Sequence, residues 1–173
     1  MNNIQIFDQV FDIMKESFPE AEYRDYQEQK LLLTHPRYSL LTEKNEQQNV
    51  IGFLAGWKFD EFSYVENVAV SSSIRGGGIG KKLMERFMEQ ATLPIVLEVE
   101  LPMNEINQRR IGFYKRLGFQ LCEFPYVQPP LRTGFKPLPL KIMSFPDHLS
   151  SIEFEKVRHV LYKEVYDVAV IHN

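Results

Sequence analysis

Residues 74–81 read Ile74-Arg75-Gly76-Gly77-Gly78-Ile79-Gly80-Lys81, and this stretch decides the fold. It follows residues 64–70, a run rich in β-branched side chains of the kind that favours strands. It precedes residues 79–91, in which apolar side chains recur at helical spacing. The sequence therefore predicts a strand, a glycine loop and a helix in direct succession.

The glycine loop has the chemistry of an anion site. Glycine has no Cβ, so it accepts positive φ and lets a ligand approach the backbone closely. The first turn of the following helix offers unpaired N–H groups and a partial positive charge. Arg75 and Lys81 can add full charges on either side. A diphosphate is the expected ligand, and a glycine-rich turn that binds nothing is the alternative.

Residue spacing excludes two common nucleotide loops. A dinucleotide fingerprint that starts at Gly76 needs a glycine at position 81, which is lysine here. A Walker loop needs a glycine at position 75 and a Ser or Thr at position 82, and these positions hold Arg75 and Lys82. The remaining pattern is Arg-x-x-Gly-x-Gly over 75–80.

A second motif lies downstream, where residues 107–119 read Asn-Gln-Arg-Arg-Ile-Gly-Phe-Tyr-Lys-Arg-Leu-Gly-Phe. Asn107 and Tyr114 are seven residues apart, which is about two helical turns and places them on one face. Together with the glycine loop, this pattern resembles the GNAT superfamily of N-acetyltransferases. The resemblance covers residues 50–145, and details of it are similar to an uncharacterised bacterial branch of that superfamily.

The resemblance implies acetyl-CoA as acyl donor and a set of residue roles. Asn107 would contact the cofactor arm, and Tyr114 would protonate the departing thiolate, a task for which a phenol is suited. Core packing is the alternative for Tyr114. Arg110 stands where the superfamily usually has alanine; it could extend to solvent, pair with an acidic neighbour or reach a phosphate. The expected cofactor-binding residues are Val68, Ala69, Val70, Arg75, Gly76, Gly77, Gly78, Ile79, Gly80, Lys81 and Asn107.

A base is also needed, because an ammonium must lose a proton before it attacks. Glu66 is the first candidate, since it lies on the strand that enters the loop and period two places it with Val68 and Val70. Several members of the superfamily have a catalytic glutamate on this strand. Glu98 and Glu100 form a rival pair, because carboxylates on a central strand are costly to bury and can act as base or ammonium ligand. For each of these carboxylates, an ordinary salt bridge is the alternative.

The order of elements predicts a mixed α/β fold in one domain over 1–173, with a central mixed sheet flanked by helices. Gly118 is expected to end the helix that carries the second motif. A closing helix over 147–166 lies outside the superfamily pattern and is expected to pack on the core or build a homodimer. The expected helices are 7–18, 23–33, 79–91 and 105–117, and the expected strands are 38–42, 50–59, 64–70, 94–101, 119–124 and 138–145, with a proline-rich surface loop over 128–139.

Amino-acid composition limits the classes of partner that the protein is expected to bind. A net charge of −3 predicts binding to neither nucleic acid nor an anionic membrane. One cysteine, Cys122, excludes an intrachain disulfide and leaves too few thiolates for a Cys-based metal site, so no metal is expected. The amino end lacks the pattern of a signal peptide, and no apolar run approaches the roughly 20 residues of a membrane span. The simplest expectation is a soluble cytoplasmic protein.

The expected reaction is direct acetyl transfer to a primary amine, most simply that of a small molecule, within a ternary complex. Cys122 has no place in either motif, so no covalent acetyl-enzyme is expected. A CoA-binding module without catalysis is the alternative function, and a structural protein with a fortuitous loop is the third. The acceptor would meet side chains of the early helices and the proline-rich loop, namely Tyr23, Arg24, Tyr26, Tyr126 and Arg132.

Overall fold

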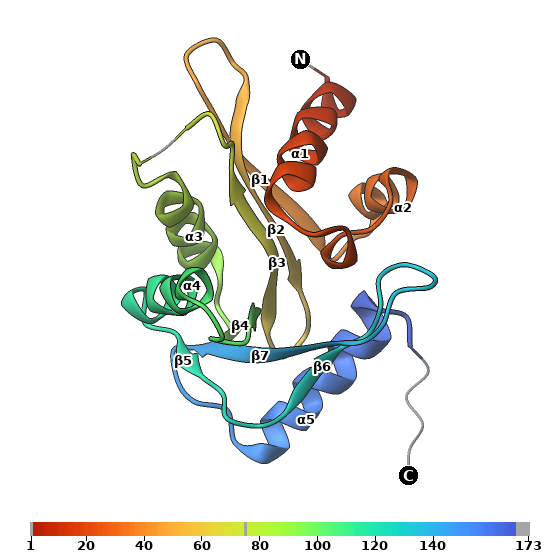
Figure 1. Ribbon diagram of the computed structural model, residues 1–173, viewed down its shortest axis with the longest axis vertical. Coiled ribbons are helices and arrows are strands. Elements are labelled where there is room, and N and C mark those ends of the chain that lie inside the picture. The colour runs from red at the N-terminus through yellow and green to blue at the C-terminus, as the bar shows by residue number, and fades with distance from the viewer. Residues whose placement is uncertain (1, 75, 169–173) are drawn as a thin grey trace. The chain divides into compact units, whose positions relative to one another are not determined.

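The computed structural model describes residues 2–74 and 76–168, and residues 1, 75 and 169–173 lie outside the description (Figure 1). The chain divides into two compact units, residues 1–93 and 94–173. The expectation of one domain over the whole chain stays a prediction.

The first unit is built on an antiparallel meander of three strands. β1 (Tyr38–Lys44) pairs with β2 (Val50–Lys58), and β2 pairs with β3 (Ser63–Val70). The polar stretch between β1 and β2 forms a turn, in which the Asn45 N–H donates a hydrogen bond to the Asn49 carbonyl. All three strands predicted in this half of the chain are therefore present, with ends within a few residues of those expected.

β3 contains a bulge at Glu66. Ala55 lies opposite Asn67, and Gly56 lies opposite Val65, so Glu66 is an extra residue without a partner on β2. A bulge interrupts the alternation of side chains along a strand. The Glu66 side chain therefore does not lie on the face of the sheet that a simple alternation with period two predicts.

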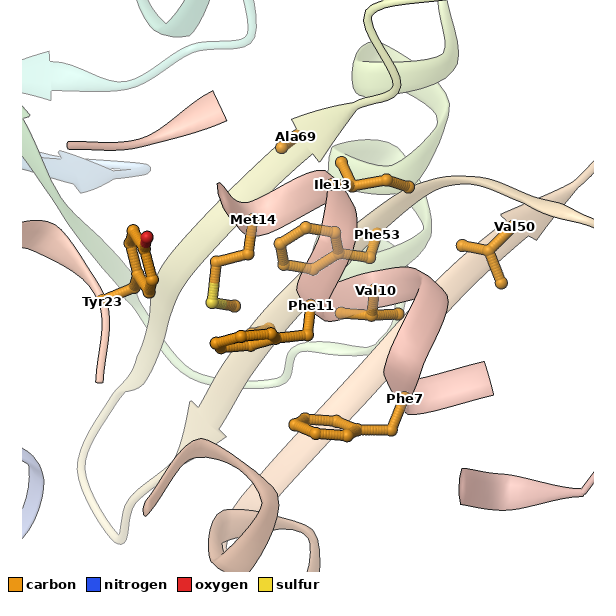
Figure 2. Close-up of a cluster of buried hydrophobic side chains, with 10 residues drawn as sticks. Phe7, Val10, Phe11, Ile13, Met14, Tyr23, Val50, Phe53 and Ala69 are labelled. Atoms are coloured by element: carbon orange, nitrogen blue, oxygen red, sulfur yellow. The ribbon is translucent and has the colours of Figure 1, made fainter. Parts of the chain in front are cut away.

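α1 (Asn3–Ser17) covers one face of the meander. The Asn2 and Gln5 side chains form a capping box at its start, which satisfies two backbone donors of the first turn. Its apolar side chains meet Phe53 of β2 in a buried cluster (Figure 2). Pro19 follows Phe18, the C-cap of this helix, and the expected helix over 7–18 begins four residues earlier than predicted. The cluster comprises Phe7, Val10, Phe11, Ile13, Met14, Tyr23, Val50, Phe53, Ala55 and Ala69.

α3 (Ile79–Gln90) covers the opposite face, and two glycines of β2 allow it to lie close (Figure 1). A Cβ added at Gly56 would lie 2.5 Å from Cε2 of Phe87, and one added at Gly52 would lie 3.0 Å from Cγ2 of Ile79. The start of α3, where the glycine loop ends, is thus seated directly against β2.

The segment between α1 and β1 contains less regular helix than predicted. It forms two 3₁₀ turns, η1 (Glu20–Glu22) and η2 (Leu32–Thr34), on either side of the short helix α2 (Tyr26–Leu31). α2 begins late because Asp25 acts as its N-cap and accepts a hydrogen bond from the Glu28 N–H. Tyr23 and Arg24 therefore lie in a connecting segment and not on a helix.

The second unit is a smaller antiparallel sheet centred on β7 (Leu138–Phe145). β4 (Ile95–Glu100) pairs with β7, and so do two short strands, β5 (Gln120–Leu121) and β6 (Tyr126–Gln128). The predicted strand over 119–124 is reduced to two residues. The predicted loop over 128–139 is a loop in its centre, but its first residue belongs to β6.

Two helices accompany this sheet. α4 (Glu105–Arg116) has Leu117 as its C-cap, and Gly118 follows with a φ of +101°, the positive value expected for a helix-ending glycine. α5 (Ser151–Val160) begins with a Ser150 capping box and continues into η3 (Leu161–Val165), a π-helical turn. The predicted closing helix is thus present from 151, and its last turn is wider than an α-helix.

Candidate active site

The glycine loop has the open backbone that its sequence predicts. Gly76, Gly77 and Gly78 have φ angles of +75°, +80° and +65°, a region that other residues rarely adopt. A Cβ at any of them would meet nothing within 4 Å. These glycines are therefore required by backbone conformation and not by crowding, and the surface above them is open to a ligand.

Gly78 is also the N-cap of α3, and no side chain caps this helix. The first N–H groups of an α-helix have no partner within the helix, and they attract anions. Ile79 and Gly80, both partly exposed, contribute the first of these groups. The glycine loop and the first turn of α3 therefore direct their backbone N–H donors toward the same region of the surface.

The charged residues around the loop differ in their availability. Lys81 is well exposed, and its Nζ lies 3.7 Å from Glu85, a loose pair within the helix. Lys82 Nζ lies 3.0 Å from a Glu43 oxygen on β1, and Glu43 also binds Arg86. Lys81 is therefore the better placed of the two lysines for an incoming anion. Arg75 lies outside the described residues.

The three residues expected on the strand before the loop form the end of β3. Ala69 is buried and belongs to the cluster under α1. Val68 and Val70 are partly exposed and lie opposite Leu54 and Gly52, on the face that α3 covers. β3 thus leads directly toward the glycine loop.

Asn107 is held at the start of α4. It is buried, its Nδ2 donates a hydrogen bond to the Leu101 carbonyl at 3.0 Å, and its backbone N–H is capped by Asn104. No described residue binds its Oδ1. The side chain is fixed in orientation and keeps one acceptor for a ligand.

Tyr114 lies two turns further along α4. Its ring packs against Phe113 and Phe119, with centroids 5.2 and 6.0 Å away. Burial raises the pKa of Tyr114 to about 12, and the nearby positive charge of Arg110 opposes this increase. Its hydroxyl has no hydrogen bond to any described residue. The ring is packed, as the alternative reading expected, but the phenol remains available as a donor.

Arg110 occupies the position that departs from the superfamily pattern. Its Nη1 lies 3.9 Å from a Glu100 oxygen, at the outer limit of an ion pair, with Arg110 exposed and Glu100 partly exposed. Of the three possibilities for this cation, pairing with an acidic neighbour is the one observed. Glu100 is correspondingly the weaker half of the rival base pair.

Glu66 lies in a buried network and not beside Val68 and Val70. Its Oε1 accepts a hydrogen bond from Arg24 at 2.8 Å, and its Oε2 accepts one from Trp57 Nε1 at 3.2 Å. Trp57 and Ala55 share one side of β2, so Glu66 points to the face of α1. The expected shared face is wrong because the bulge at Glu66 reverses the alternation.

Polar groups continue from this network toward α2. Tyr38 packs on Trp57 with ring centroids 5.3 Å apart, and its hydroxyl accepts a hydrogen bond from Gln29 Nε2 at 3.2 Å. Gln29 is 1% exposed, and its Oε1 has no partner among the described residues. Burial raises the pKa of Tyr38, and the Glu66 charge adds to this effect. Tyr38 therefore stays a neutral phenol.

Glu98 is the centre of a second cluster, in the other unit. Its carboxylate accepts hydrogen bonds from the hydroxyls of Tyr126 and Tyr166. Tyr126 was expected near the acceptor, whereas Tyr166 was not singled out. The closing segment carries no family motif. The only signal in the sequence is the spacing of Tyr166 four positions after Tyr162, which is typical of one helix face.

The other expected acceptor residues have structural partners. Tyr23 joins the apolar cluster, and the Tyr26 hydroxyl donates a hydrogen bond to Asp8 at 2.6 Å. Arg24 pairs with Glu66, and Arg132 is partly exposed. Sequence reasoning did not identify Trp57, which binds Glu66, or Gln29, which binds Tyr38. An isolated Trp or Gln on an apolar pattern gives no signal beyond that of a core residue.

Two further observations concern the described residues as a whole. None of their His, Cys, Asp and Glu side chains form a group of three or more that could hold a metal ion. None of the helices they form is long and apolar enough to cross a membrane.

Comparison with known proteins places this site in a family. The model of the acetyltransferase (GNAT) family matches residues 5–119. A solved structure assigned to the GNAT family, from Bacteroides thetaiotaomicron, is 37% identical with a TM-score of 0.87, covering 96% of this chain and 95% of that one. An aminoglycoside 6'-N-acetyltransferase complexed with coenzyme A has a TM-score of 0.63 at 19% identity, covering 83% and 91% of the two chains.

A characterised relative matches part of the chain. It is the peptidyl-lysine N-acetyltransferase YjaB of Escherichia coli K12, 29% identical over 106 residues, which are 60% of this chain. The match spans 65% of that relative's length, slightly less than two thirds. The family match leads to one conclusion: the chain belongs to the GNAT family and has its mixed α/β fold with helices flanking the sheet.

Proposed function

We propose that this protein transfers the acetyl group of acetyl-CoA to the primary amine of a small molecule, by direct attack within a ternary complex. The observation that carries the proposal is the pairing of two features. One is the open, positive-φ glycine loop at the start of α3. The other is a Tyr114 hydroxyl that no described residue binds.

The donor site follows from the loop. The N–H groups from Gly76 to Gly80 bind the pyrophosphate of acetyl-CoA, and Arg75 and Lys81 supply positive charge. The end of β3, Val68–Val70, runs beside the acyl arm. Asn107, fixed by its bond to Leu101, offers its Oδ1 to an amide N–H of that arm.

The reaction conserves atoms without a further reagent. The neutral amine nitrogen attacks the thioester carbonyl carbon, a C–N bond forms, and the C–S bond breaks. Tyr114 donates a hydrogen bond to the leaving sulfur, and the proton lost by the amine finally resides on the thiol of CoA. Because the pKa of Tyr114 is raised to about 12, the phenol enters each cycle protonated.

Glu66 is the proposed proton acceptor for the amine. A carboxylate has about four lone-pair directions, and Arg24 and Trp57 occupy one on each oxygen. One direction on each oxygen is left for the amine or for a bridging water. Glu98 and Glu100 are the alternative base candidates, and Glu66→Gln compared with Glu98→Gln under saturating acetyl-CoA separates them.

The competing function is a CoA-binding module without catalysis. A Tyr114 hydroxyl that no described residue binds argues against it, because packing alone would be served equally well by phenylalanine. Initial rates with both substrates varied should give intersecting reciprocal plots, and acetyl-CoA alone should leave the mass of the protein unchanged. Parallel plots with an acetylated protein would overturn the direct mechanism. Tight CoA binding without turnover on any amine, peptide or protein lysine would favour the module.

A further inference from the structure

Gln29 of α2 and Tyr38 of β1 form a hydrogen-bonded pair within the first unit. Gln29 Nε2 donates a hydrogen bond to the Tyr38 hydroxyl at 3.2 Å. Gln29 is 1% exposed, and its Oε1 is a buried side-chain oxygen with no partner among the described residues. Leaving a buried acceptor unpaired costs free energy, which a donor that binds there recovers. The Gln29 oxygen is therefore suited to a group that carries a donor.

Tyr38 supplies the complementary donor. Burial and the Glu66 charge raise the pKa of its phenol, which therefore keeps its proton. The hydroxyl oxygen accepts a hydrogen bond from Gln29, and no residue in the described part of the chain accepts the Tyr38 proton. The pair thus offers both a donor and an acceptor to a third group. Exchanging the oxygen and nitrogen of the Gln29 amide would change which residue offers which, and both would still be offered.

This pair borders the residues that hold Glu66. Tyr38 and Trp57 are register partners on β1 and β2, and their ring centroids lie 5.3 Å apart. Trp57 Nε1 in turn donates a hydrogen bond to Glu66 Oε2 at 3.2 Å. All four side chains belong to the first unit, residues 1–93. A ligand that places its amine at Glu66 therefore has the Gln29–Tyr38 pair beside the same Trp57 ring.

A neutral hydroxyl matches this pair, because its one oxygen both donates and accepts. An ammonium can only donate and would leave the Tyr38 proton unpaired. A carboxylate can only accept, and it would also face the Glu66 charge. We propose that Gln29 and Tyr38 bind a hydroxyl group of the acceptor, which is therefore an amino alcohol whose amine reacts at Glu66. This inference rests on the proposed function and names its substrate class.

The test pairs amino alcohols with alkylamines of equal length: 2-aminoethanol with propylamine, 3-amino-1-propanol with butylamine, and 4-amino-1-butanol with pentylamine. Rates are expressed per neutral amine, because a hydroxyl changes the pKa of the amine itself. The wild type should favour the amino alcohol of at least one pair in kcat/KM by about tenfold or more. Tyr38→Phe and Gln29→Met should each reduce that preference several-fold, with an unchanged KM for acetyl-CoA. Gln27→Met, exposed on the same helix, should leave the preference intact.

Equal kcat/KM within every pair in the wild type would overturn the inference. So would an equal loss on both amines in Tyr38→Phe and Gln29→Met, which is the result expected if the pair binds only water or is purely structural.

A second readout does not need turnover. Trp57 is the single tryptophan of the chain, so its indole N–H gives one NMR signal. With CoA bound, at least one amino alcohol should shift this signal at lower concentration than its matched alkylamine, and Tyr38→Phe should remove the difference. If no amine releases thiol, the proposed function fails, and the titration still decides the hydroxyl site. Equal titration curves for every pair would then overturn the inference.

Discussion

Arg24 and Glu66 form an ion pair at 2.8 Å with almost no access to solvent, since their side chains are 9% and 5% exposed. The pair joins the segment between η1 and α2 to the bulge of β3. Trp57 supplies the second donor to the same carboxylate. The orientation of Glu66 is therefore fixed by two residues from different elements before any substrate arrives.

Breaking this pair should destabilise the protein strongly. Arg24→Met leaves a buried carboxylate without its charge partner, a change that costs about 3–5 kcal/mol in comparable pairs. Arg24→Met with Glu66→Leu should recover much of the loss, because no unpaired charge remains. Urea unfolding measures both. Arg37→Met breaks an exposed pair with Asp60 and should cost about 1 kcal/mol or less. An Arg24→Met cost as small as that of the control would refute this account of the pair.

Tyr114→Phe should lower kcat by a factor typical of a lost proton donor, about 10²–10⁴. It should leave acetyl-CoA binding nearly intact. Because burial raises the Tyr114 pKa to about 12, the phenol stays protonated over the usual assay range. The wild-type kcat should therefore not fall between about pH 8 and about pH 10 through Tyr114 ionisation. Stopped-time assays measure kcat, and calorimetry measures the affinity for acetyl-CoA. Unchanged turnover in Tyr114→Phe would contradict the assignment.

Gly77→Val should weaken acetyl-CoA binding by about tenfold or more, because a β-branched residue at φ +80° moves the loop N–H groups. Gly134→Val provides a matched control. Gly134 also has positive φ, +87°, and open space around its Cβ, but lies in the proline-rich loop. Similar loss of affinity in both variants would show that the effect is general strain and not loss of the anion site.

Gly56→Ala should destabilise the first unit by about 1–3 kcal/mol, the usual cost of overpacking a core. Its new Cβ would lie 2.5 Å from the Phe87 ring of α3. Combining it with Phe87→Leu should return part of the lost stability, whereas Phe87→Leu alone destabilises by leaving a void. Thermal unfolding of the three variants gives the coupling energy, and strict additivity would contradict the proposed contact.

The sequence predicts local signals of this fold well. Proline after α1, glycine before α3 and glycine after α4 each mark a helix boundary through backbone geometry, and the structure has its boundaries there. β3 follows the β-branched pattern of residues 64–70, and β1 and β2 lie where strands are predicted. β5 and β6 are too short for a periodic pattern to form, so the sequence could not define them.

The candidate site is less predictable where distant segments meet. The motif residues Asn107 and Tyr114 lie on one helix, and their spacing reveals them. The bulge at Glu66 depends on the pairing of β2 with β3, which no single strand encodes. The contact of Glu98 with Tyr166, 68 residues further along the chain, depends on the π-turn that Tyr166 follows. Such tertiary contacts change which face of a strand or helix a side chain lies on, and they leave the local sequence pattern unchanged.

The central claim is acetyl transfer from acetyl-CoA to an amine, and thiol release tests it most directly. The purified protein is incubated with acetyl-CoA and a panel of mono- and diamines, free CoA thiol is measured, and the amine product is weighed by mass spectrometry. The account predicts amine-dependent thiol release, equimolar with a product heavier by one acetyl group, and its strong reduction in Tyr114→Phe. Acetyl-CoA that binds but releases no thiol with any amine would contradict it.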